Sequence, residues 1–105
     1  DVVLEAVGVV TVSTSGAIDW NSFKTSKVEV TASTTGLQIS GINNGVRKGA
    51  VVQIRNAGVN AVTLAYNSTA FYLKGGVSAA LDDNRKVITM QALSANSWTE
   101  IYRNF

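Results

Sequence analysis

β-branched side chains dominate this 105-residue chain, which contains fifteen Val, six Ile and ten Thr against six Leu. Such side chains are stiff at χ1 and fit the pleated surface of strands better than the surface of a helix. Short alternating apolar segments are interrupted throughout by clusters of Gly, Asn and Ser, which favour turns. The pattern therefore predicts an all-β fold: a single antiparallel β-sandwich, jelly-roll-like, with about eight to ten short strands.

The alternation also predicts which side chains are buried. Val52 and Ile54 share one face of a strand, and Val62 and Leu64 share one face of another. We expect a core containing Val52, Ile54, Val62, Leu64, Leu73 and Ile88. We expect strands at residues 2–6, 9–13, 17–23, 27–33, 36–42, 50–56, 60–66, 70–74, 86–93 and 97–103.

The connections between these segments carry their own signals. Residues 56–59 are typical of a hairpin loop, in which Gly58 would take a positive φ. Residues 87–90 and 98–103 predict a terminal hairpin with a period of two throughout. Residues 77–84 have helical spacing but are too few for a stable helix, so we expect a loop with a single turn.

The length indicates one domain, residues 1–105, large enough to fold without disulfides or metals. Because Asp1 is not an initiator residue, we expect the chain to be the C-terminal or processed part of a longer polypeptide. No apolar run is long enough for a membrane span. Only Arg47-Lys48 and Arg85-Lys86 are adjacent basic pairs, so we expect no nucleic-acid partner.

The chain lacks Cys and His, which removes thiolate nucleophiles, imidazole general bases and the usual zinc ligands. We therefore expect no catalytic residues, no cofactor and no metal. Asp82 and Asp83 could offer oxygen ligands to Ca²⁺, but they lack the spacing of a dedicated calcium loop. Asp19 and Glu100 stay open as a carboxylate pair for glycoside hydrolysis, against the simpler interpretation of solvated carboxylates.

Aromatic side chains could form a stacking platform for a sugar, or they could pack in the core or between subunits. The aromatic candidates are Trp20, Trp98, Tyr66, Tyr72 and Tyr102. In a sandwich, loops make the contacts with a ligand, and the loops considered are 42–48, 66–69 and 75–84. The candidate ligand-binding residues are Tyr66, Asn67, Asp82, Asp83 and Asn84.

Several segments together resemble the small β modules of phage tail fibres and other virion surface proteins. The resemblance begins with Ala17-Ile18-Asp19-Trp20, followed by Phe23 and a strand at 28–30. It continues with residues 49–58, 62–64, 71–73, 85–90 and 98–103. Among these, 49–58 is a Gly-led strand ending in Asn-x-Gly, 62–64 is a V-T-L strand, and 98–103 is a final W-x-E-x-x-R strand.

The resemblance implies a non-catalytic structural protein on the virion exterior: a capsid decoration, a head-fibre knob or a tail-fibre module. It implies a homotrimer in contact with other virion proteins, such as capsid or tail components. The charged fraction of 15% and the lack of Pro at strand edges also favour an oligomer. The alternative is a glycan-binding module that recognises a host surface polysaccharide, for example at a fibre tip, and a small glycosidase or lyase domain is a third hypothesis.

Overall fold

A computed structural model describes residues 7–22, 25–43 and 47–105. The expected strand at 2–6 and Phe23 lie outside the described residues, as do residues 44–46 of the loop 42–48. The elements are β1 (Gly8–Val12), β2 (Gly16–Asp19), the 3-10 turn η1 (Trp20–Ser22), β3 (Lys27–Ala32), β4 (Leu37–Asn43), β5 (Val51–Asn56), β6 (Val62–Leu64), β7 (Phe71–Tyr72), the 3-10 turn η2 (Lys74–Gly76), β8 (Ala79–Leu81), β9 (Val87–Ser94) and β10 (Ser97–Arg103).

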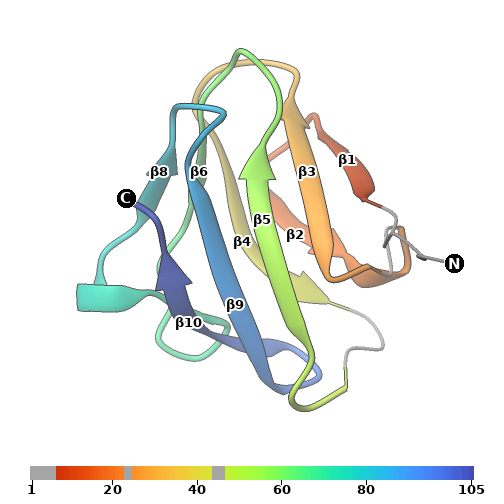
Figure 1. Ribbon diagram of the computed structural model, residues 1–105, viewed down its shortest axis with the longest axis vertical. Coiled ribbons are helices and arrows are strands. Elements are labelled where there is room, and N and C mark those ends of the chain that lie inside the picture. Colours follow the sequence, from red (N-terminus) through yellow and green to blue (C-terminus); the bar gives the residue numbers. More distant parts are fainter. Residues whose placement is uncertain (1–6, 23–24, 44–46) are drawn as a thin grey trace, which may run out of the picture.

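The described strands form two sheets that face each other across one core (Figure 1). The six-stranded sheet has the order β1-β3-β5-β9-β10-β7, and the four-stranded sheet has the order β2-β4-β6-β8. This confirms an all-β fold built from two sheets.

The first three pairs of strands follow a solenoid-like path. The chain alternates between the sheets, so β1, β3 and β5 lie parallel in one, and β2, β4 and β6 lie parallel in the other. The expectation of an antiparallel, jelly-roll-like sandwich was therefore wrong. An alternating pattern shows which face of a strand is buried, and it is the same whether the neighbouring strand runs parallel or antiparallel.

The segment 56–59 is a corner between the two sheets and not the expected hairpin loop, since β5 and β6 belong to different sheets. Gly58 does not adopt a positive φ. A Cβ at this position would lie 3.0 Å from Thr31 Cγ2, which is closer than such atoms normally approach. The lack of a side chain at Gly58 therefore lets this corner pack closely against Thr31 of β3.

The chain reverses after β7. Gly75 and Gly76 have φ angles of 78° and 68°, a left-handed conformation that glycine adopts easily. The chain then returns as β8, antiparallel to β6, and β9 pairs antiparallel with β5. The expectation of a loop at 77–84 was wrong, because this segment contains β8, whose Ala79 and Leu81 side chains are buried in the core.

The expected terminal hairpin is confirmed, since β9 and β10 pair antiparallel. The expected period of two throughout was wrong, because the register shifts between Glu100 and Tyr102. Glu100 lies opposite Met90, and Tyr102 lies opposite Thr89. The extra residue, a β-bulge, sends Tyr102 to the outer face of the six-stranded sheet.

The predicted core is confirmed. The six side chains expected inside are fully buried: Val52, Ile54, Val62, Leu64, Leu73 and Ile88. Trp98 is also fully buried, and its Nε1–H donates to the carbonyl oxygen of Ile42 at 3.0 Å. This bond joins β10 of the six-stranded sheet to β4 of the four-stranded sheet.

Candidate functional site: a groove beside β7 and β10

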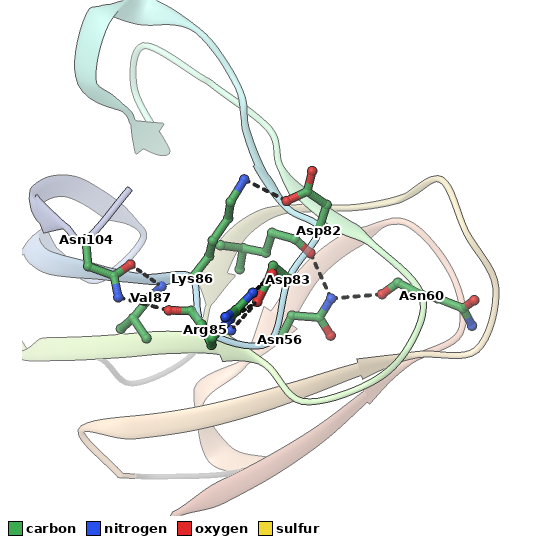
Figure 2. Close-up of polar contacts among 9 residues, drawn as sticks. Asn56, Asn60, Asp82, Asp83, Arg85, Lys86, Val87 and Asn104 are labelled. Atoms are coloured by element: carbon green, nitrogen blue, oxygen red, sulfur yellow. Dashed lines mark hydrogen bonds and ion pairs between the residues drawn. The ribbon is translucent and has the colours of Figure 1, made fainter.

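The acidic residues expected to bind a ligand instead form ion pairs at the corner between β8 and β9 (Figure 2). Asp82 accepts from Lys86 Nζ at 2.6 Å, and this hydrogen bond lowers the pKa of Asp82. Asp83 accepts from Arg85 Nε, Nη2 and backbone N–H at 2.8–3.1 Å. These bonds, the side-chain ones first, lower the pKa of Asp83 to about 2.

Asn84 contributes to the same corner through its backbone, since its carbonyl oxygen accepts from Arg55 Nη1 at 2.9 Å. Asn104 fixes the corner from the other side, donating to the carbonyl oxygen of Arg85 and accepting from the backbone N–H of Val87 (Figure 2). The groups at 82–84 therefore have a structural role in this arrangement.

Asn67 and Tyr66 lie at the opposite end of the β6–β8 pair from Asp82, because Leu64 lies opposite Ala79 and Val62 lies opposite Leu81. The Asn67 side-chain oxygen accepts three hydrogen bonds from Thr69 and Ala70, which close a tight turn. Tyr66 is partly buried against the core. The fold does not bring the five predicted ligand-binding residues together.

A different surface feature, a groove of about 460 Å³, lies beside β7 and β10. Exposed aromatic and aliphatic side chains line it together with charged ones. Its lining residues are Tyr72, Lys74, Gly75, Thr99, Glu100, Ile101, Tyr102, Arg103 and Phe105.

Two tyrosines of the groove lie on the outer face of the six-stranded sheet. Tyr72 lies beside Thr99 in the parallel β7–β10 pair, and the bulge in β10 brings Tyr102 to the same face. Their exposed fractions are 49% and 65%. Tyr66 packs edge-on against Tyr72, with ring centroids 5.7 Å apart, and thereby supports one wall of the groove.

The other aromatic candidates have structural roles. Trp98 is in the core, and Trp20 packs partly buried against it at a centroid distance of 6.5 Å. Of the five aromatic residues considered for sugar stacking, Tyr72 and Tyr102 are the ones with well-exposed rings.

A partly buried ion pair forms the polar part of the groove. Glu100 accepts from Arg103 Nε and Nη2, both at 2.6 Å, and from the backbone N–H of Lys74 at 2.8 Å. The bonds from Arg103 lower the pKa of Glu100 against the opposing effect of burial. The Arg103 guanidinium also lies 5.0 Å from the centre of the Phe105 ring, within the range of a cation–π contact.

Sequence reasoning named Tyr72 and Tyr102 as aromatic candidates for sugar stacking, but it did not predict that they line one groove. Phe105 follows the last strand and belongs to no pattern, and Tyr102 lies an even number of residues from the buried Trp98. Strict alternation therefore places Tyr102 in the core, and the bulge that reverses this has no evident signal in the sequence.

The carboxylates considered for hydrolysis have other partners: Asp19 accepts from the backbone N–H of Asn21 at 2.9 Å, and Glu100 is paired with Arg103. Within the described ranges, no three metal-binding side chains gather at one point. Nor do the described residues include a helix with the length and apolar character needed to cross a bilayer.

Comparisons of this chain with protein-family models, with curated proteins and with solved structures gave no match.

Proposed function

We propose that this chain is a non-catalytic structural module of a virion exterior, either a fibre module or a capsid decoration, which associates as a homotrimer and contacts other virion proteins. The observation that carries the proposal is the pair of edge strands at one end of the fold (Figure 1). β1 is an edge strand of the six-stranded sheet, and β2 is an edge strand of the four-stranded sheet. No described strand pairs with the outer side of either one. The resemblance of the sequence to virion β modules supports a location on the exterior of a virion.

Edge strands of this kind present unpaired backbone donors and acceptors, and proteins cover or charge such edges when they must stay monomeric. β1 carries no charged residue, and its Val9 side chain is 65% exposed. A neighbouring copy that covers this edge would bury Val9 and satisfy the backbone groups. The edge thus favours association.

The test is the mass of the chain in solution and its response to a charge on β1. Sedimentation equilibrium at micromolar concentration should give about three times the monomer mass of 11.1 kDa. Val9→Lys should shift the equilibrium toward monomer, because it places a charge on the edge strand. Val59→Lys is the matched control, since Val59 is fully exposed on the corner after β5. A wild-type chain that stays monomeric at high concentration would contradict the trimer.

A second candidate function is glycan binding through the groove beside β7 and β10. The exposed rings of Tyr72 and Tyr102 can cover the apolar face of a sugar, while Thr99 offers a hydroxyl for hydrogen bonds. This proposal moves the binding site from the predicted loops to the end of β10. The expected ligand is a polysaccharide of the host surface.

The groove is tested with a polysaccharide array and two variants. Tyr102→Ala removes an exposed ring and should abolish or strongly weaken retention, whereas Val77→Ala, which alters an exposed residue outside the groove lining, should not.

A further inference from the structure

The side-chain charges in the groove beside β7 and β10 do not balance. Glu100 is only 3% exposed at its side chain, and both of its oxygens accept from Arg103. The negative charge of this carboxylate is therefore already compensated and is turned away from solvent. It offers little repulsion to a negatively charged ligand.

Lys74 contributes the remaining charge. Its backbone N–H binds Glu100, but no described carboxylate forms an ion pair with its ammonium group, and the residue is exposed. Because the charges of Glu100 and Arg103 cancel, the side chains that line the groove carry one net positive charge, beside two exposed tyrosine rings.

We propose that the groove selects an acidic glycan, with the tyrosine rings stacking on a sugar and the Lys74 ammonium pairing with the acidic group. This inference rests on the second proposed function, glycan binding. A charge-assisted hydrogen bond to a sugar acid is stronger than one to a neutral hydroxyl, so an acidic chain is favoured over a neutral chain of similar size. Carboxylated, sulfated and phosphorylated sugars share this chemistry.

The probes are a set of acidic polysaccharides and a set of neutral ones. The acidic set contains polygalacturonate, hyaluronan, alginate, polysialic acid, chondroitin sulfate and a phosphorylated mannan, and the neutral set contains methyl-esterified polygalacturonate, dextran, laminarin and unmodified mannan. The two polygalacturonates form a matched pair, since they have the same sugar backbone and differ in whether the carboxyl group is free and charged or methyl-esterified and neutral. Binding is measured for the wild-type chain at low and at moderate salt.

We expect at least one acidic probe to bind more tightly than every neutral probe, and its affinity to fall as salt is added. Lys74→Gln should weaken that binding by about fivefold or more, the range expected for loss of one charge-assisted contact. Lys48→Gln is the control, because it removes the same charge from an exposed residue outside the groove lining. Tyr102→Ala should weaken binding to the same probe.

Three other outcomes overturn one or both proposals, and they can be told apart. Equal binding of acidic and neutral probes, lost in Tyr102→Ala and kept in Lys74→Gln, would leave glycan binding in place and remove the preference for acids. Equal losses of binding to the acidic probe in Lys74→Gln and Lys48→Gln would mean that the overall charge of the chain, and not Lys74 in the groove, causes the preference for acids. No binding of any probe would remove both proposals together.

Discussion

Glu100 and Arg103 point to the same side of β10 although they are three residues apart. In a regular strand, residues three apart face opposite sides, but the bulge between Glu100 and Tyr102 adds one residue to this interval. Glu100 lies opposite Met90 and Arg103 opposite Ile88, and both of these partners are buried. One irregularity of the strand thus creates the ion pair and also sends Tyr102 outward.

This pair predicts a pH dependence of stability. The pKa of Glu100 is lowered from 4.5 when the chain folds, so its ion pair stabilises the fold fully above pH 4.5 and is lost as the pH falls through the lower folded-state pKa. At pH 7, Glu100→Gln should lower the free energy of unfolding by about 1–3 kcal/mol. The difference from wild type should shrink below pH 4.5. Urea unfolding at several pH values measures this, and a difference that is the same at pH 3 and pH 7 would contradict it.

The core predicts a contrast between two neighbouring residues. Leu64 is fully buried, while Thr63 on the same strand is only partly buried. Leu64→Ala should cost roughly 2–5 kcal/mol of stability, because it removes buried methyl groups and leaves a cavity. Thr63→Ser should cost far less. The measurement is chemical denaturation, and similar losses in the two variants would mean that the faces of β6 are wrongly assigned.

Among the residues that the structure describes, Asn56 is the one polar residue that is buried, and its side-chain amide connects β5 to β8. Its Nδ2 donates to the carbonyl oxygens of Asn60 and Leu81, and its Oδ1 accepts from the N–H of Gly58 (Figure 2 shows the first two bonds). Asn56→Ala should cost about 3 kcal/mol, because it leaves buried backbone groups without partners.

The matched control for this variant is Asn67→Ala. The Asn67 side chain likewise takes part in three hydrogen bonds, but it lies on an exposed turn where water can replace it. Its loss should cost about 1 kcal/mol or less. Thermal and urea unfolding of both variants give the comparison, and a larger effect at Asn67 would contradict the role assigned to Asn56.

Gly58 and Thr31 should show energetic coupling. The Cβ of Gly58→Ala would meet Thr31 Cγ2 at 3.0 Å, so this variant should lose about 1–3 kcal/mol of stability. Thr31→Ser removes that methyl group. In the Thr31→Ser background, Gly58→Ala should therefore cost much less. A double-mutant cycle measures the coupling, and strictly additive effects would count against the steric explanation.

Calcium should not stabilise the chain. The carboxylates of Asp82 and Asp83 are already paired with Lys86 and Arg85, so a cation would have to displace both partners. Thermal unfolding in calcium and in EDTA should give the same midpoint. A midpoint that is several degrees higher in calcium than in EDTA would contradict the structural role assigned to this corner.

The sequence by itself determined the strand content and most of the core. β-branched residues in short alternating segments favour strands locally, and burial follows from alternation, so Val52, Ile54 and Leu64 could be placed inside without knowledge of their neighbours. The terminal hairpin could be predicted for the same reason, since two alternating segments joined by a short turn pair with each other.

Only the tertiary structure decided how the strands pair and where a groove lies. Whether β5 pairs with β6 or crosses to the other sheet depends on contacts between distant residues, such as the close approach of Gly58 to Thr31. The groove depends on the bulge that turns Tyr102 outward and pairs Glu100 with Arg103. Local propensity fixes the conformation of a segment, but the partner and register of a strand are fixed by packing against the rest of the chain.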